Sequence, residues 1–134
     1  MNEPVSFSGS CFCGVIRFHF EGPSKWCAHC HCSMCRKVHG AGYVTWAGFE
    51  SEQAKLDEGE DWLTWYESSK GASRAFCSRC GSSMFFKAER WEGEIHVALG
   101  CLDDPIDRKP QAHAFHDSHV DWVPLDDALQ IFNG

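Results

Sequence analysis

The chain has 134 residues, of which 43% are hydrophobic and 13% aromatic, and its formal net charge is −7. This length fits one core, so we expect residues 1–134 to form a single domain. The acidic charge argues against binding to nucleic acid or to a membrane surface, since both need a basic face. The start, MNEPVSFSGS, lacks the basic and apolar regions of a secretion signal, and no apolar run is long enough to span a membrane. We therefore expect a cytoplasmic protein.

Short runs of alternating hydrophobicity predict a mainly β fold. In VIRFHF, residues 15–20, the side chains of Ile16, Phe18 and Phe20 share one face, which is the period of a half-buried strand. Further strands are predicted at residues 42–49, 61–67, 73–77, 83–87 and 94–100. Turn residues separate these runs by short links, so we expect antiparallel pairing.

The remaining segments predict little regular structure. One short helical turn is expected at residues 33–40, with Ser33 as its N-cap and Gly40 as its stop. Residues 51–60 are expected to form a polar connection on the surface, and Asp126-Asp127 a solvated turn. The apolar residues of the tail are expected to close the core from outside: Trp122, Leu125, Leu129, Ile131 and Phe132.

Nine cysteines, an odd number clustered at C-x-C and C-x-x-C spacings, indicate zinc ligands rather than disulfides. Two pairs are each followed directly by glycine, in Cys11-Phe12-Cys13-Gly14 and Cys77-Ser78-Arg79-Cys80-Gly81. Such a turn points two sulfurs at one metal, and the glycine lets the backbone pass close to it. We predict that Cys11, Cys13, Cys77 and Cys80 form a closed structural zinc site that stabilises the fold.

A second group, Cys30, Cys32 and Cys35, places three thiols within reach of one ion. Three protein ligands leave the fourth position for water or substrate, which is the arrangement of catalytic zinc. Cys27 and Cys101 are interpreted as small buried residues. Either could instead supply a fourth ligand, and the C-x-x-C spacing of Cys27 and Cys30 keeps that alternative open.

Several motifs together resemble the glutathione-dependent formaldehyde-activating enzyme family, which includes centromere protein V. These are GSCFCG, CHCSMCRKVHGAGY, FCSRCGSSMF, LGCLDDP and a late HAF and W, and they run from about residue 8 to the tail. The resemblance implies an Mss4-like fold of antiparallel sheets around zinc and a carbon–sulfur lyase that condenses glutathione with formaldehyde. It also implies two zinc ions per chain, with Cys11, Cys13, Cys77 and Cys80 holding the structural one and Cys30, Cys32 and Cys35 holding the second. Partial filling of the second site is left open.

The leading hypothesis is therefore a zinc enzyme that binds a thiol such as glutathione, lowers the pKa of that thiol and directs the thiolate at an aldehyde such as formaldehyde. Arg36 and Lys37 follow Cys35 directly and are predicted to bind the substrate's carboxylates, with a solvated helix face as the alternative. A non-catalytic zinc scaffold with both sites closed is the rival hypothesis. A third is a redox sensor that uses Cys27 and Cys101.

The histidines are the other candidates for metal ligands. His29 and His31 flank Cys30 and are interpreted as packing beside the cluster rather than as ligands. His113, His116 and His119 are spaced by three, but their segment reads as strand and loop, so we do not expect a third metal site there.

Overall fold

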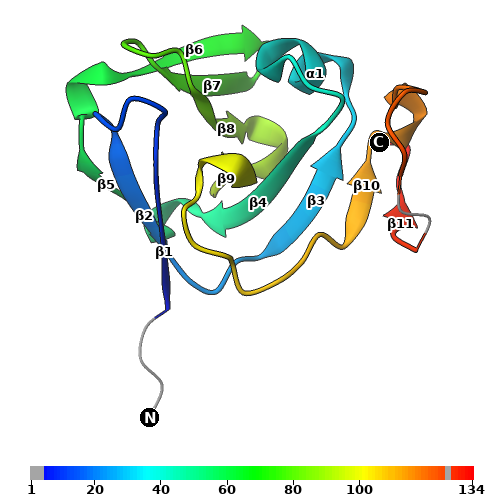
Figure 1. Cartoon of the computed structure of the whole chain (residues 1–134), viewed down its shortest axis with the longest axis horizontal. Coiled ribbons are helices and arrows are strands. Elements are labelled where there is room, and N and C mark those ends of the chain that lie inside the picture. The colour runs from blue at the N-terminus through cyan, green and yellow to red at the C-terminus, as the bar shows by residue number, and fades with distance from the viewer. Residues whose placement is uncertain (1–4, 126–127) are drawn as a thin grey trace.

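The computed structural model describes residues 5–125 and 128–134, and its main elements are strands (Figure 1). The strands are β1 (Ser6–Ser10), β2 (Arg17–Glu21), β3 (Trp26–Cys30), β4 (Val44–Glu50), β5 (Ala54–Glu58), β6 (Leu63–Ser69), β7 (Ala72–Cys77), β8 (Ser83–Ala88), β9 (Glu94–Ala98), β10 (Ala112–Ala114) and β11 (Gln130–Ile131). The helical segments are α1 (Ser33–His39) and the 3₁₀ turns η1 (Ser51–Gln53), η2 (Glu60–Trp62), η3 (Glu89–Trp91), η4 (Leu99–Cys101) and η5 (His116–Ser118). The expected class, mainly β and Mss4-like with one short helical turn, is confirmed.

Two sheets make up the fold. One has the order β1-β2-β5, and the other has the order β11-β10-β3-β4-β9-β8-β7-β6. All six predicted strands are present, with ends shifted by at most two residues. The predicted surface connection at residues 51–60 contains β5, which pairs with β2. Its mostly exposed side chains give it no alternating pattern, which is why the sequence does not reveal it.

The strands joined by short links, from β6 to β9, pair antiparallel as expected, whereas one edge of the larger sheet is parallel. β10 runs parallel to both β3 and β11. The chain leaves β9, crosses the molecule through residues 99–111 and adds β10 beside β3, as Figure 1 shows on the side where the C-terminus lies. A long connection of this kind permits parallel pairing, which a tight turn does not.

The tail does not close the core. Trp122, Ile131 and Phe132 are 68%, 50% and 46% exposed. Their segment packs at the sheet edge, where it pairs with β10 instead of covering the core. The predicted turn at Asp126-Asp127 lies outside the described residues.

The helix α1 begins and ends close to the predicted positions. Its N-cap is Cys32 and not Ser33, because the Cys32 Sγ accepts the backbone N–H of Cys35 at 3.3 Å. Gly40 closes the helix in the left-handed conformation with φ of 60°, as expected. Among the described residues, no helix is both long and apolar enough to cross a membrane.

The central strands β7, β8, β9, β4 and β3 are packed on both faces. On one face they meet β1 and β2 and form the larger core: Phe7, Cys11, Ile16, Phe18, Phe20, Ala47, Phe49, Ala75, Cys77, Met84, Phe85, Ile95 and Val97. The other face carries a smaller cluster: Cys30, Cys35, Val44, Trp46 and Ala98. Because successive side chains on a strand point to opposite faces, neighbouring residues serve different clusters.

One row of cross-strand neighbours runs along the second face. Trp26, Gly48, His96, Phe86 and Arg74 follow one another, each the register partner of the next. The glycine in this row makes room for an aromatic ring, because a Cβ atom on Gly48 would overlap the indole of Trp26. Gly48 therefore leaves a space over β4, and the Trp26 indole fills it.

Replacing Gly48 with alanine tests this packing. Gly48→Ala is expected to lower the free energy of unfolding by about 1–3 kcal/mol, because the Trp26 indole has to leave its place over β4. Gly100→Ala is the matched control, since a Cβ atom there meets nothing within 4 Å. Urea unfolding of both variants measures the difference, and equal stabilities would contradict the close contact.

Candidate metal centres and the adjoining pocket

The first group of cysteines joins two distant turns. Cys11 and Cys13 follow β1, while Cys77 ends β7 and Cys80 lies in the turn to β8. Their four Sγ atoms all lie within 4.8 Å of one another. Four sulfurs at this separation are a ligand set for a soft, tetrahedral metal ion. The structure thus brings together the four residues that the sequence pairs predict.

Local hydrogen bonds build each half of this group. The backbone N–H groups of Ile16 and Cys80 donate to the sulfurs of Cys11 and Cys77, both at 3.4 Å. Gly14 and Gly81 have φ values of 80° and 85°, which glycine adopts without steric cost. The glycine after each cysteine pair therefore permits the turn that aims the two sulfurs together.

The second group forms where β3 meets α1. Cys30 ends β3, Cys32 caps the helix, and Cys35 lies buried in its first turn. Their three Sγ atoms lie within 4.8 Å of one another. Hydrogen bonds from Cys30 and Cys35 hold the pKa of Cys32 far below its ordinary value, whereas the same contacts raise the pKa of Cys30. The thiolate form is therefore favoured at Cys32, and the three sulfurs lie close enough together to hold a metal ion.

Cys27 and Cys101 stay apart from this group. Cys27 is three positions from Cys30 and so faces the other side of β3, where it is 1% exposed. The Cys101 thiol instead donates to the Ser83 carbonyl at 3.7 Å. Burial raises the pKa of both thiols to about 11. Among residues 5–125 and 128–134, the second group consists of three cysteines and no further Cys, His, Asp or Glu ligand.

A pocket of about 470 Å³ opens beside the three cysteines, all of which line it. Aromatic rings supply much of its remaining wall: Trp26, Trp46, Phe86, Trp91 and Phe115. Its charged lining consists of Lys70, Arg74, Arg90 and Glu89, with three cations to one carboxylate. A mostly apolar pocket with a few polar groups near a reactive centre is typical of a small-molecule site.

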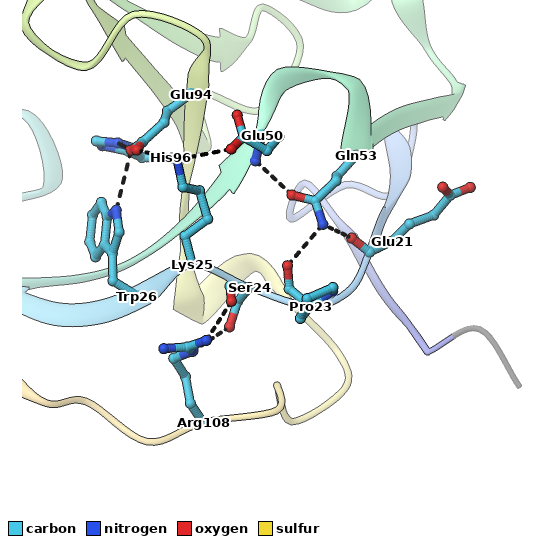
Figure 2. Close-up of polar contacts among 10 residues, drawn as sticks. All are labelled: Glu21, Pro23, Ser24, Lys25, Trp26, Glu50, Gln53, Glu94, His96 and Arg108. Carbon is cyan, nitrogen blue, oxygen red and sulfur yellow. Dashed lines mark hydrogen bonds and ion pairs between the residues drawn. The ribbon is translucent and has the colours of Figure 1, made fainter. Parts of the chain in front are cut away.

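One half-buried carboxylate, that of Glu94, holds two side chains of this wall in place. Figure 2 shows Glu94 accepting hydrogen bonds from the indole of Trp26 at 3.2 Å and from His96 Nε2 at 3.0 Å. Lys25 also contacts Glu94 at 2.8 Å and bridges it to Glu50. Because Glu94 accepts the Nε2 proton, it keeps the His96 ring in a fixed orientation against Trp26.

Arg74 is a functional candidate that the sequence analysis missed. It lies on β7, is 2% exposed, and donates from Nη2 to the Cys35 sulfur at 3.5 Å. Its guanidinium carbon lies 4.9 Å from the centre of the Phe86 ring. Its one sequence signal was a charged residue inside the predicted strand at residues 73–77.

Arg36 and Lys37 lie elsewhere on α1. Arg36 donates from Nε to the His31 carbonyl at 3.3 Å, and Lys37 is exposed. The residues that line the pocket beside the cysteines do not include either of them. Their role in substrate binding stays a prediction from the sequence.

Five histidines gather between β3, β10 and η5: His29, His31, His113, His116 and His119. His31 Nε2 and His113 Nδ1 form a hydrogen bond of 2.8 Å, and the rings of His116 and His119 stack at 4.3 Å. In the part of the chain that the structure describes, their nitrogens do not assemble into a metal-ligand group. The segment from residue 112 to 118 forms the expected strand, and a 3₁₀ turn stands where a loop was expected.

Both cysteine groups lie in a region whose sequence matches a known enzyme family. Residues 6–118 match the sequence model of the glutathione-dependent formaldehyde-activating enzyme family, a span that includes all seven clustered cysteines. The chain belongs to this family. The resemblance noted from the cysteine motifs is therefore confirmed.

Three individual proteins resemble this chain in sequence or in fold. A protein of Halomonas elongata, named provisionally as a glutathione-dependent formaldehyde-activating enzyme, is 28% identical over 129 residues, which cover 91% of this chain and 82% of that protein. An uncharacterized lyase of Schizosaccharomyces pombe is 29% identical over 82 residues, or 60% of this chain and 56% of that protein. A crystal structure of a Rhodobacter sphaeroides protein shares the fold, with a TM-score of 0.62, 24% identity, and coverage of 75% of this chain and 92% of that chain.

Replacing Glu94 with glutamine tests how the pocket wall is held. Glu94→Gln is expected to lower the free energy of unfolding at pH 7 by about 1–3 kcal/mol, because charge-assisted hydrogen bonds from Lys25, Trp26 and His96 are lost. Urea unfolding and tryptophan fluorescence measure the change. The exposed Glu92, replaced in the same way, is the control and is expected to change stability by less than about 0.5 kcal/mol.

The stabilisation of the fold by Glu94 depends on pH, and the pKa of its carboxyl group gives the sign. Burial raises the pKa of Glu94, but hydrogen bonds from Lys25, His96 and Trp26 outweigh it and lower the pKa below the ordinary 4.5. The ionised carboxylate therefore stabilises the fold fully above pH 4.5, and this stabilisation is lost as the pH falls through the lowered pKa. The stability difference between wild type and Glu94→Gln is expected to shrink in that acidic range. A difference that grows there would contradict the assignment.

Proposed function

We propose that this protein is a zinc-dependent carbon–sulfur lyase-type enzyme that makes or breaks the adduct of a thiol, such as glutathione, with an aldehyde, such as formaldehyde. Membership of the family and the names of its relatives support glutathione and formaldehyde as the substrate pair. The proposal includes two zinc ions per chain. One is held by Cys11, Cys13, Cys77 and Cys80, and the other by Cys30, Cys32 and Cys35.

The observation that carries this proposal is the difference between the two cysteine groups. The first offers four sulfurs and can satisfy a tetrahedral ion completely. The second offers three, and all three line the pocket of about 470 Å³. A site with three protein ligands beside a pocket can accept a substrate atom, whereas a four-ligand site cannot. The scaffold hypothesis needs a fourth ligand, and neither Cys27 nor Cys101 joins the group.

In the proposed mechanism the protein holds a thiol and keeps it ionised. Zinc, when bound by the three cysteines, would supply a soft Lewis acid that lowers the pKa of the substrate thiol. Arg74 places a buried positive charge beside Cys35 and offsets the negative charge of the sulfurs. Trp46 and Phe86 exclude water from this end of the pocket, so that the thiolate meets the aldehyde in an apolar environment.

The mouth of the pocket fits an anionic thiol. Lys70 and Arg90 are both exposed and line it, where they can meet carboxylates of glutathione. Arg90 lies over the rings of Trp91 and Phe115 at 4.7 and 5.6 Å, which orients its guanidinium. The prediction that Arg36 and Lys37 bind carboxylates of the substrate is kept beside this one. Both residues would act from α1.

The redox-sensor hypothesis finds less support. Burial raises the pKa of Cys27 and Cys101 to about 11, so both thiols stay protonated and unreactive at neutral pH.

We also propose that residues 1–134 act as one zinc-binding domain in the cytoplasm. Thiolate ligands need such a reducing compartment, and all nine cysteines are unpaired by disulfides.

Turnover is measured directly by exchange NMR on glutathione mixed with ¹³C-formaldehyde. The zinc-filled protein is expected to accelerate formation and breakdown of S-hydroxymethylglutathione by roughly tenfold or more over the spontaneous reaction, in proportion to its concentration. Serum albumin at the same concentration controls for non-specific thiol effects. No acceleration by protein carrying two zinc ions per chain would contradict the proposed function.

Single cysteine replacements separate the two metal groups. Cys35→Ser is expected to abolish turnover and lose one zinc while the chain stays folded, because the first group still joins β1 to β7. Cys77→Ser removes a ligand of that first group, whose metal would contribute on the order of 10 kcal/mol to folding, and is expected to unfold the chain. Zinc analysis and circular dichroism measure both outcomes. X-ray absorption that finds four sulfurs on every zinc would refute the open second site.

A further inference from the structure

Arg74 is a buried cation in an unusual setting. It is 2% exposed and lies in the wall of the pocket, next to the three cysteines. Within the described residues no carboxylate comes within ion-pair distance of its guanidinium. Its Nη2 donates to the Cys35 sulfur, while its Nε and Nη1 atoms are buried and have no hydrogen-bond partner. Unpaired buried donors destabilise a fold, so their presence here calls for a functional reason.

The surroundings of Arg74 restrict which ligand atoms can reach its unpaired Nε and Nη1 donors. Phe86 covers the guanidinium face, and the register row places Phe86 between Arg74 and His96. The planar guanidinium is fixed at one end by Cys35, so the other donors stay within the same few ångströms of the sulfur group. A ligand atom that reaches them must therefore belong to the part of the substrate that lies at the cysteines. The exposed cations Lys70 and Arg90 are better placed for its distant carboxylates.

We propose that Arg74 binds the oxygen of the reacting carbon, that is, the aldehyde oxygen that becomes an alkoxide when the thiolate adds to it. This inference rests on the proposed function and deepens it. Hydrogen-bond donors fixed at the place where negative charge develops are among the largest contributions to enzymatic rate, because they need no reorganisation during the reaction. A partly dry, aromatic pocket strengthens their effect.

Addition of the thiol to the aldehyde needs no reagent other than the two substrates and water. The substrate thiol loses its proton to solvent, and the thiolate sulfur forms a bond to the aldehyde carbon. The π electrons of the carbonyl move to oxygen, where Arg74 donates hydrogen bonds to the resulting alkoxide. Water then protonates the alkoxide to give the hydroxyl of the adduct, and breakdown runs through the same steps in reverse. Arg74 donates hydrogen bonds in these steps and transfers no proton.

Two replacements of Arg74 test the role in turnover. Arg74→Met keeps an unbranched side chain against Phe86 but removes all donors, and is expected to lower kcat by about 100-fold or more with a small change in KM for glutathione. Arg74→Lys keeps the charge beside Cys35 but not the planar set of donors. Its kcat is expected to lie between those of wild type and Arg74→Met. Arg79→Met is the matched control, because Arg79 also lies over an aromatic ring, that of Trp62, but outside the pocket.

A second measurement does not depend on activity. Formate carries a planar oxyanion of the size of the aldehyde, and its binding is followed by the fluorescence of the pocket tryptophans, Trp26, Trp46 and Trp91. Saturable quenching is expected in wild type and in Arg79→Met, and at least tenfold weaker binding in Arg74→Met. Zinc content is measured on every variant, and comparisons are made between samples with two zinc ions per chain.

The outcomes distinguish the two proposals. If wild type turns over and Arg74→Met retains kcat, or binds formate as tightly as wild type, Arg74 is not the oxygen-binding group. If Arg74→Met raises KM alone, the residue binds a distant part of the substrate and the inference is overturned. If wild type itself shows no turnover with glutathione and formaldehyde, the proposed function fails. Formate binding that depends on Arg74 would still support an oxyanion site in that case, for a different thiol or aldehyde.

Discussion

The alternation of side chains along strands that are packed on both faces governs the structure. In β4, Ala47 and Phe49 enter the larger core, while Trp46 faces the pocket. The same rule separates Cys27 from Cys30 on β3 and Arg74 from Ala75 on β7. One sheet can thus support an apolar core and a chemical site back to back, and a shift of one residue in register would exchange them.

The two cysteine groups differ because of where the chain places them. The first joins turns at the ends of β1 and β7 and lies beside the larger core, where a metal ion held by the four sulfurs would fasten the two sheets together. The second lies where β3 passes into α1, and its three sulfurs line the pocket. A helix that begins directly at Cys32 keeps Cys35 close to Cys30 while leaving one side of the group open to the pocket.

Charge in the pocket is arranged by burial. The three cysteine sulfurs and the buried Arg74 lie together, with exposed cations further out and Glu94 behind the aromatic wall. Glu94 takes hydrogen bonds from Trp26 and His96 without facing a cation of the pocket, so it fixes the wall but does not neutralise Arg74. A buried cation that has no carboxylate partner among the described residues is a cost to stability that is expected at a functional site rather than in a core.

Features that depend on near neighbours were predictable from the amino-acid sequence: the six alternating strands, the short helix, the two cysteine pairs with their glycines, and the family. Three other features appear once the sheets are assembled: Cys27 and Cys101 stay apart from the second group, β10 lies parallel to β3, and Arg74 rather than Arg36 lines the pocket. Metal knuckles and strand periods are local, so their signals are complete within a few residues. Burial of a charge beside a sulfur depends on cross-strand register, because residues 39 positions apart, Cys35 and Arg74, meet when the sheet is assembled.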